Sequence, residues 1–477
     1  MVFSSITFLF FFLPTVVVLY YVTPRPLKNS LLLLASLLFY VWGAGVFTSL
    51  LLIAIISNYG LGWLVHAGRE RHSVVLKHLG VCLSVLVSLG ILGYFKYANF
   101  LIDAVNQFGG YFGTAEMVWS RIVLPIGISF FTFQSMSYVI DVSRGTSKAM
   151  RNPIDFALYV SFFPQLIAGP IVRFHEIDGQ IIKRNERWDD FCEGTIRFTW
   201  GLVKKVVIAD AAGAIAVRVL DMPFEDVTTE AAWIGLFAYT IQIYFDFSGY
   251  SDMAIGLGRM FGFKLPENFR RPYAAISCTD FWRRWHITLS AWFRDYVYFP
   301  MGGSRASRGR TIFNLLFLFL LVGIWHGANW TFVVWGVYNG VIMVIERIAG
   351  WATDDPTSVR NPVLQRAVTF MLVMLGWTIF MCPSLDQAGE YYARLFDFSF
   401  HGLGELEPWI APENMVLLLI GGLTLFLPHD FQGGIWIATS RSRGAMAARL
   451  ALVTLALPWS ILLAISGTFS PFIYFQF

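Results

Sequence analysis

The chain has 477 residues, of which 56% are hydrophobic and only 14% charged. An ordinary soluble domain has roughly 45–50% apolar and about 25% charged residues, so this composition excludes a soluble fold and predicts an all-α polytopic membrane protein. The formal net charge is +4, and the lysines and arginines fall mainly between apolar runs. Membrane topology accounts for that placement, so no nucleic-acid partner is expected.

Apolar runs follow one another from the N-terminus onward. The first, residues 7–22, has the length of a signal peptide but lacks a basic n-region and a small-residue cleavage site, so we expect it to be retained. Judged against the roughly 20 residues needed to cross a bilayer, the runs predict about 11–12 transmembrane helices. The later runs include residues 121–141, 233–247, 311–325, 328–345, 368–381, 415–427 and 450–466.

Basic residues between the runs indicate the sidedness of the chain, because short loops rich in lysine and arginine stay cytoplasmic. Arg25 and Lys28 follow the first run, and Lys204 and Lys205 are assigned to a later cytoplasmic loop. Residues 221–230 are acidic and are assigned to the outside. This alternation predicts that both termini are extracytoplasmic.

One apolar run is better explained by a re-entrant hairpin than by a crossing. Residues 156–170 (FALYVSFFPQLIAGP) begin and end beside basic loops and contain Pro164 and Gly169. Irregular backbone at membrane depth is tolerated only where it lines a cavity or is covered by protein. Gln165 lies at the proposed turn, where it either lines such a cavity or supports the broken backbone as a structural amide.

A histidine interrupts the apolar stretch LVGIWHGANWTFVVWG, residues 321–336. If Arg310 lies at the inner face, a helix from Thr311 carries His326 roughly 22 Å into a hydrocarbon core about 30 Å thick. An ionisable group at that depth is costly and marks a functional site by default. The alternative is an interhelical histidine that bonds to a backbone carbonyl or a hydroxyl.

The neighbours of His326 favour a functional site. Gly323 and Gly327 remove side-chain bulk on both sides, Trp325 brings an indole N–H donor, and Asn329 follows at i+3. The cluster predicts the wall of a polar cavity rather than a packing seam.

Residues 278–303 (CTDFWRRWHITLSAWFRDYVYFPMGG) mix charged and aromatic side chains. Thr279 or Asp280 is suited to cap a helix that begins at Phe281. The mixture is typical of a membrane interface, where tryptophans form an aromatic belt. The segment therefore predicts an amphipathic helix.

Three residues of this segment have two interpretations. Arg283 and Arg284 either meet lipid phosphates or attract the phosphates of a soluble ligand. His286 adds little to an anionic-lipid contact when neutral, but its unperturbed pKa near 6.5 lets it exchange protons with a substrate.

Asp246, in YFDFSGYSDM at residues 244–253, is another costly group in an apolar run. It orients a histidine, pairs with an arginine or lies in the interface, and we expect pairing. The four cysteines are scattered and predict neither a disulfide framework nor a thiolate metal site, so no metal is expected. The other histidines are expected to be solvated, namely His66, His72, His78, His175, His401 and His429.

Two blocks, RRWHITLSAWFRDYVYFPMGGSR (283–305) and GIWHGANWTFVVWG (323–336), resemble the signature of the membrane-bound O-acyltransferases. The similarity is greatest to the bacterial branch that contains the membrane subunit of alginate O-acetyltransferase. Supporting blocks lie along nearly the whole chain, at residues 124–145, 162–173, 244–263 and 266–273 and in the terminal FIYFQF.

The resemblance implies a single membrane-embedded domain over residues 1–477, with re-entrant and amphipathic helices around a central tunnel. It implies transfer of an acetyl group from a cytoplasmic thioester donor, most simply acetyl-coenzyme A, to an extracytoplasmic polysaccharide such as alginate. No bound cofactor is implied. A bacterial inner membrane is the expected location. The resemblance also implies that a separate periplasmic partner similar to an SGNH hydrolase makes the last transfer, and the sequence itself contains no GxSxG elbow.

His326 matches the catalytic histidine of the family, and His286 matches its second motif histidine. A hydroxyl is a poor nucleophile, so a base must take its proton during attack on the thioester, and His326 is the candidate base. Asn329, the Trp325 N–H and protonated His286 are alternative donors to the oxyanion. The topology places His286 near the cytoplasmic side and His326 much deeper, which would fit a tunnel.

Other functions remain open at this point. A transporter or flippase for a glycan or lipid-linked intermediate would also have many spans and buried polar residues. The acceptor could equally be peptidoglycan. A scaffold of an envelope assembly complex would tolerate the loss of His326.

Overall fold

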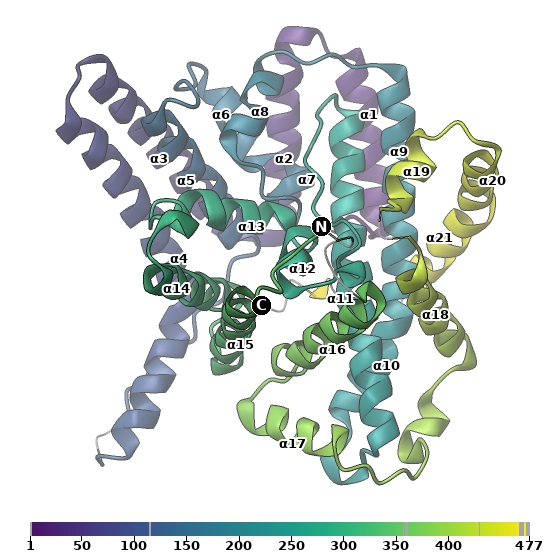
Figure 1. Cartoon of the computed structure of the whole chain (residues 1–477). Coiled ribbons are helices and arrows are strands. Elements are labelled where there is room, and N and C mark those ends of the chain that lie inside the picture. The colour runs from purple at the N-terminus through teal and green to yellow at the C-terminus, as the bar shows by residue number, and fades with distance from the viewer. Residues whose placement is uncertain are drawn as a thin grey trace. The chain divides into compact units, whose positions relative to one another are not determined.

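The computed structural model describes residues 2–113, 116–355, 357, 361–428, 430–466 and 472–473. Every regular element in these ranges is helical, which confirms the all-α class (Figure 1). Within these described ranges, six helical stretches are long and apolar enough to cross a membrane, fewer than the number expected from the sequence. The remaining predicted spans correspond to helices that are shorter or less apolar, such as Phe8–Val22 and Pro412–Phe426.

The chain folds into two compact units. The first unit comprises Met1–Gly194 and Ala254–Pro266, and the second comprises Thr195–Met253 and Glu267–Phe477. The predicted single domain over residues 1–477 stays a prediction.

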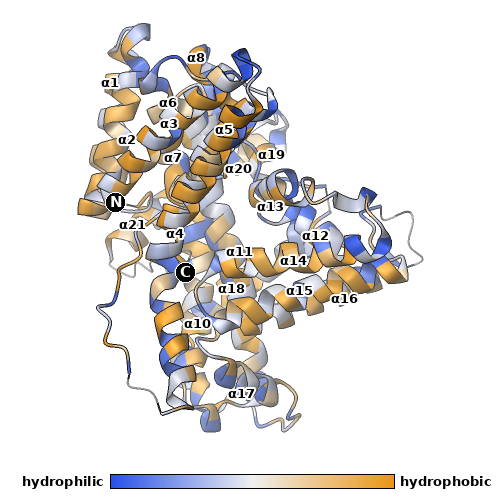
Figure 2. Cartoon of the chain, turned by 90° about the vertical axis from the view of Figure 1, so that its left-hand side faces the viewer, coloured by the Kyte–Doolittle hydropathy of each residue, from blue (hydrophilic) through white to orange (hydrophobic). Residues whose placement is uncertain are grey.

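The first unit is built on long apolar helices that pack side by side. Leu34 and Leu38 of α2 and Ile56 of α3 remain more than half exposed, as expected of side chains that face lipid, and Figure 2 shows these helices largely in hydrophobic colour. The elements are α1 (Leu13–Val22), α2 (Lys28–Ala44), α3 (Thr48–Glu70), α4 (Val74–Gly110), α5 (Ile128–Arg144), α6 (Pro153–Ser161), α7 (Phe163–Leu166), α8 (Phe174–Ile182) and the start of α9 (Trp188–Val203).

The predicted re-entrant segment is a broken helix. α6 ends at Ser161, Phe162 leaves the helical conformation with ψ 111°, and α7 then adds a single turn. Gln165 is fully buried and donates from Nε2 to the carbonyl of Tyr159 at 2.6 Å. The amide therefore supports the broken backbone, which is the structural one of its two expected roles.

The second unit holds the rest of the chain. Its α14 and α15 pack closely against each other, because glycine at 323 leaves room where a Cβ atom would collide with the backbone of Phe332 and Gly336. The elements are the end of α9, η4 (Lys204–Ala209), α10 (Asp210–Asp221), α11 (Thr229–Met260) as far as Met253, α12 (Cys278–Arg284), α13 (Ile287–Phe293), α14 (Arg308–His326), α15 (Trp330–Ala349), α16 (Pro362–Met381), α17 (Leu385–Leu395), α18 (Pro412–Leu423), α19 (Gly433–Thr439), α20 (Arg443–Ala451), η12 (Leu452–Ala456) and α21 (Leu457–Ile465).

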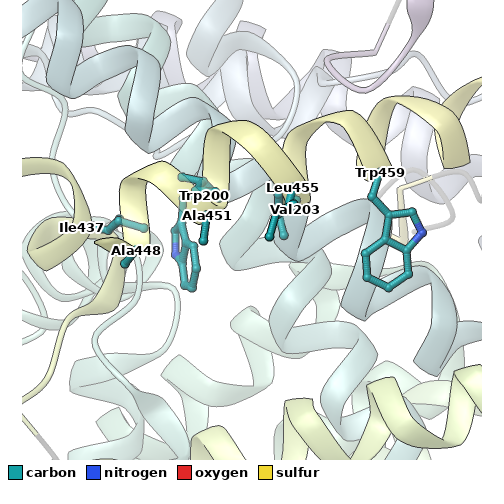
Figure 3. Close-up of a pocket in the computed structure, with 9 residues that line it drawn as sticks. Trp200, Val203, Ile437, Ala448, Ala451, Leu455 and Trp459 are labelled. Carbon is teal, nitrogen blue, oxygen red and sulfur yellow. The ribbon is translucent and has the colours of Figure 1, made fainter. Parts of the chain in front are cut away.

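The last helices form one continuous apolar rod. α20, η12 and α21 join without a break over Arg443–Ile465, and this rod lies beside Trp200 and Val203 of α9 (Figure 3).

Lys204 and Lys205 are not loop residues. They begin η4, and their side chains are only 8% and 4% exposed. Lys204 Nζ lies 3.0 Å from Asp252 Oδ2, and Lys205 Nζ lies 3.0 Å from Asp246 Oδ1. The assignment of these lysines to a cytoplasmic loop is therefore wrong, because buried carboxylates rather than the positive-inside rule explain them.

Candidate active site

His326 is the last residue of α14 and is 3% exposed. Its imidazole lies in a box of aromatic rings, with centroid distances of 4.9 Å to Trp325, 5.1 Å to Trp335 and 5.2 Å to Phe380. All three rings meet the imidazole edge to face. These rings leave the candidate base almost no exposure to solvent.

The glycines around His326 have a different role from the one expected. A Cβ atom at Gly327 would overlap the ring of Phe332, and Gly323 packs against Gly336. Small residues of this kind let helix backbones approach closely. These glycines therefore form a packing seam, and the prediction that they open a polar cavity is wrong.

His286 lies at a break between two short helices. α12 begins at Cys278 with Ser277 as its N-cap, so neither Thr279 nor Asp280 is the cap and the helix starts before Phe281. The backbone of His286 then adopts φ 45° and ψ 52°, in the left-handed region that non-glycine residues seldom occupy. The predicted amphipathic helix is consequently two helices, and the histidine lies at their junction.

The side chain of Asn268 fixes the imidazole of His286. Asn268 Oδ1 accepts hydrogen bonds from the backbone N–H of Thr288 at 3.2 Å and from its hydroxyl at 2.9 Å, and it lies 3.1 Å from His286 Nδ1. An atom that accepts from a backbone N–H is an oxygen, so Nδ1 carries the hydrogen and Nε2 the lone pair. Asn268 Nδ2 donates in turn to Ser251 Oγ at 3.1 Å.

His286 is neutral in this environment. It is fully buried, and the centroid of the Phe247 ring lies 4.6 Å from that of the imidazole, with the two rings perpendicular. His286 lies outside the apolar helices that are long enough to span a membrane. Burial lowers the pKa of its imidazole to about 3. A neutral imidazole does not supply the cationic oxyanion donor that the sequence left open.

Replacing Asn268 by alanine removes the acceptor that sets this tautomer. We expect Asn268→Ala to lower the free energy of unfolding by about 1–3 kcal/mol, because the buried hydrogen-bond donors of Thr288 lose their partner. Chemical denaturation in mixed micelles measures this change. If Asn268→Ala is as stable as the unmodified protein, the hydrogen bonds of Asn268 do not organise the junction.

Trp325 connects the two histidines. Its indole centroid lies 5.9 Å from that of His286 and 4.9 Å from that of His326. The sequence-based topology separated the two histidines widely in depth, but the structure places both against one side chain. Trp325 is thus a shared neighbour of the two imidazoles, and the central tunnel stays a prediction.

Further aromatic residues complete this cluster, and the sequence did not single them out. Trp377 stacks on Trp335 with centroids 5.9 Å apart and contacts Trp285 at 5.1 Å. Its Nε1 donates to the hydroxyl of Tyr273 at 3.2 Å. Trp377 and Phe380 are spaced i, i+3 on α16, which places both on the same face of that helix.

Asn329 serves as the N-cap of α15. Its Oδ1 accepts from the backbone N–H of Thr331 at 3.2 Å, and its Nδ2 donates to the carbonyl of Pro383 at 2.8 Å. Both ends of the amide are thus occupied by backbone groups, so the side chain holds the helix start rather than a reacting atom.

Asp246 is paired, as expected, but with a lysine. It is 1% exposed, and besides Lys205 it accepts a hydrogen bond from the backbone N–H of Ile473 at 2.8 Å. Phe472, which precedes this contact, packs against Phe247, the residue whose ring meets His286. Asp246 is therefore connected to His286 only indirectly, through the packing of Phe472 and Phe247. None of its described hydrogen bonds is to a histidine.

Arg283 and Arg284 differ in exposure. Arg284 is 15% exposed and donates from Nε to Asp280 Oδ1 at 2.6 Å, four residues earlier on α12. Arg283 is 56% exposed and pairs with Asp354. The guanidinium of Arg283 is thus partly exposed and bound to Asp354, whereas that of Arg284 stabilises α12.

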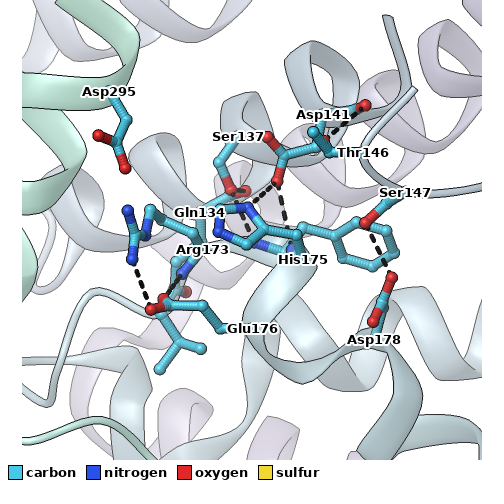
Figure 4. A network of polar contacts seen from close by, with 12 residues as sticks. Gln134, Ser137, Asp141, Thr146, Ser147, Arg173, His175, Glu176, Asp178 and Asp295 are labelled. Carbon is cyan, nitrogen blue, oxygen red and sulfur yellow. Dashed lines mark hydrogen bonds and ion pairs between the residues drawn. The ribbon is translucent and has the colours of Figure 1, made fainter. Parts of the chain in front are cut away.

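The first unit contains a separate polar network around Asp141 and His175 (Figure 4). His175 Nδ1 lies 2.9 Å from Asp141 Oδ2, and the same oxygen accepts from the backbone N–H of His175 at 3.2 Å. His175 is 35% exposed while Asp141 is 2% exposed. His175 is exposed, as predicted, but its ring is also held by a buried carboxylate. His429 lies outside the described residues.

The hydrogen bond to Asp141 raises the pKa of His175. A raised pKa means that the folded state binds the proton more tightly than the unfolded state, so the stabilisation is full below the unfolded pKa of about 6.5 and is lost as the pH rises through the folded value. We expect the difference in Tm between the unmodified protein and His175→Gln to be largest at acidic pH and to shrink as the pH rises. His401→Gln, an exposed control in the second unit, should show no such trend. A difference that is independent of pH would mean that the pair is not an ion pair.

Comparison with known proteins shows which family the chain belongs to. The family model of the membrane-bound O-acyltransferases (MBOAT) matches residues 46–385. The chain is 43% identical over 507 residues to a probable alginate O-acetylase AlgI of Azotobacter vinelandii, with 100% of both chains covered. It is 36% identical to the peptidoglycan O-acetyltransferase of Helicobacter pylori, covering 81% of this chain and 78% of that one.

A more distant relative is the teichoic acid D-alanyltransferase of Bacillus subtilis, which is 27% identical over 70% of this chain. All these relatives are acyl-transferring proteins by name. The family model covers more than half of the chain, and the histidine blocks 283–305 and 323–336 both lie within the match. The chain therefore belongs to the membrane-bound O-acyltransferase family and is an acyltransferase with apolar helices that suit a multi-pass membrane protein.

Proposed function

We propose that this acyltransferase moves an acetyl group from a cytoplasmic thioester donor, acetyl-coenzyme A, for O-acetylation of an extracytoplasmic polysaccharide of the alginate type. One observation carries the proposal: two buried imidazoles share the Trp325 indole in a chain that is 43% identical, end to end, to a probable alginate O-acetylase. The protein acts in the bacterial inner membrane with both termini outside. A periplasmic SGNH-hydrolase-like partner completes the transfer to the polymer.

His326 acts as the general base in this proposal. Its imidazole takes the proton of the acceptor hydroxyl as the oxygen attacks the thioester carbonyl, and a tetrahedral oxyanion forms. The carbon–sulfur bond then breaks, and the imidazolium returns the proton to the leaving thiolate. The aromatic box excludes water, which strengthens each electrostatic interaction and protects the thioester from hydrolysis.

Trp325 and His286 support this base. Among the three oxyanion donors expected from the sequence, Asn329 caps a helix and His286 is neutral, so the geometry favours the Trp325 N–H. His286 presents a fixed Nε2 lone pair beside the same indole and is assigned a positioning role for substrate or donor. Arg283, being exposed, is assigned to the phosphates of the donor.

The experiment is acetyl transfer by the full chain in proteoliposomes with radiolabelled acetyl-coenzyme A, alginate and a candidate periplasmic partner. The proposal expects consumption of the donor and label in the polymer. Intact acetyl-coenzyme A together with movement of a glycan across the membrane would instead establish a transporter or flippase. Consumption with label in peptidoglycan but not in alginate would keep the acyltransferase and replace the acceptor, as the Helicobacter relative suggests.

A further inference from the structure

The second unit contains an apolar groove away from the histidines. It encloses about 440 Å³ between α9 and the rod formed by α20, η12 and α21 (Figure 3). Every lining residue is Ala, Val, Leu, Ile or Trp: Trp200, Val203, Ile437, Ala448, Ala451, Leu452, Leu455, Ala456 and Trp459. The groove has the size of a site for a single small ligand but contains no charged or hydrogen-bonding side chain other than the two indoles.

The sequence of the rod explains why the space is empty of side chains. Ala448, Ala451, Leu455 and Trp459 recur at spacings of three and four residues, and Ala456 lies next to Leu455 and three residues before Trp459, so they share one face of the helix. Alanines occupy three of these positions, where a leucine would fill the gap to α9.

The groove opens on a surface that suits lipid. The segment Arg443–Ile465 is apolar enough to cross a membrane, and only 11% of its most apolar window is buried. Ala448 and Trp459 are eleven positions apart, which corresponds to about 16 Å of helix, or half of a hydrocarbon core about 30 Å thick. One acyl chain of one leaflet has this length.

Positive charge gathers at one end of the groove. Arg441 and Arg443 are exposed directly before the turn of α20 that carries Ala448. Arg449 donates from Nε to the carbonyl of Ile437 at 2.6 Å and from Nη2 to the carbonyl of Ser440, which ties α19 to α20. A phospholipid has a phosphate that basic groups attract and an acyl chain that fits an apolar groove one leaflet long, so it complements both features.

We propose that this groove binds one anionic glycerophospholipid, with an acyl chain over Ala451 and Ala456 and the headgroup phosphate beside Arg441 and Arg443. The bound lipid fills the space between α9 and the C-terminal rod. The site is independent of the acyl-transfer reaction and lies on different residues from the histidines.

In the test, the full chain is reconstituted in detergent with equal amounts of phosphatidylglycerol and phosphatidylcholine of the same acyl composition. Native mass spectrometry, in which the protein is released from the detergent, then identifies the lipids that stay bound. We expect one retained phosphatidylglycerol per protein. Ala451→Trp fills the groove and should abolish retention, whereas Ala447→Trp, at an exposed position of the same helix outside the groove, should not. Thermal stability establishes that both variants are folded.

The double variant Arg441→Gln/Arg443→Gln tests the headgroup without touching the groove. Loss of two surface cations should lower the preference for phosphatidylglycerol over phosphatidylcholine about tenfold or more. Equal retention of both lipids by the unmodified protein, or unchanged retention by Ala451→Trp, would overturn the proposal. If the protein is a dimer and Ala451→Trp makes it monomeric, the groove binds a second copy of the chain. That result would also overturn the lipid proposal.

Discussion

Replacing His326 by alanine should lower the rate of acetyl transfer about 10²–10⁴-fold, the usual contribution of a positioned general base. The reason is geometric: the imidazole is buried among Trp325, Trp335 and Phe380, and none of these rings carries a basic group that could replace it. The measurement is turnover of radiolabelled acetyl-coenzyme A by purified protein. The defect should fall on kcat, because the aromatic box that shapes the site is retained.

Two comparisons separate catalysis from folding in that experiment. His401→Ala changes an exposed histidine of the second unit and should leave turnover unchanged. The Tm of His326→Ala should stay close to that of the unmodified protein, although the removed ring leaves some space in the box. Full activity of a folded His326→Ala protein would refute the general-base assignment and favour a scaffold.

The second large effect is expected at Asp252. Its carboxylate joins two buried cations, since Arg197 Nε donates to Oδ1 at 2.7 Å and Lys204 Nζ donates to Oδ2 at 3.0 Å. Glu267 also pairs with Arg197, but it makes no described contact with Lys204. Asp252→Ala therefore leaves the ammonium of Lys204 buried over the rings of Tyr244 and Phe245 but without its paired carboxylate, and breaking a buried ion pair in this way costs about 3–5 kcal/mol.

Denaturation in mixed micelles measures the loss of stability at Asp252. Asp252→Asn keeps hydrogen-bonding groups in place and should lose less than Asp252→Ala. The matched control is Asp189→Ala, which breaks an exposed pair with Arg187 whose side chains are 71% and 72% exposed, and an exposed pair contributes about 1 kcal/mol or less. Equal effects of Asp252→Ala and Asp189→Ala would show that the buried network does not stabilise the second unit.

Several properties followed from the sequence because they depend on local composition. The apolar runs gave the all-helical class, and the blocks around His286 and His326 gave the family. The interrupted helix at residues 156–170 was predictable because proline and glycine act on the backbone within a few residues. The assignment of Lys204 and Lys205 to a loop was wrong, because the positive-inside rule considers only the basic residues between apolar runs. It does not include a carboxylate some 40 to 50 positions away in the sequence that pairs with a lysine in the fold.

The arrangement of the candidate site was decided only by tertiary structure. Asn268 precedes His286 by 18 positions, and Phe380 follows His326 by 54, so no helical period connects them. The left-handed backbone of His286 likewise arises where two short helices meet. The order and composition of the residues determined that the protein is a membrane acyltransferase with two histidine-containing motifs. Packing between distant segments determined the tautomer of His286, the aromatic neighbours of both histidines and the ion partners of the buried charges.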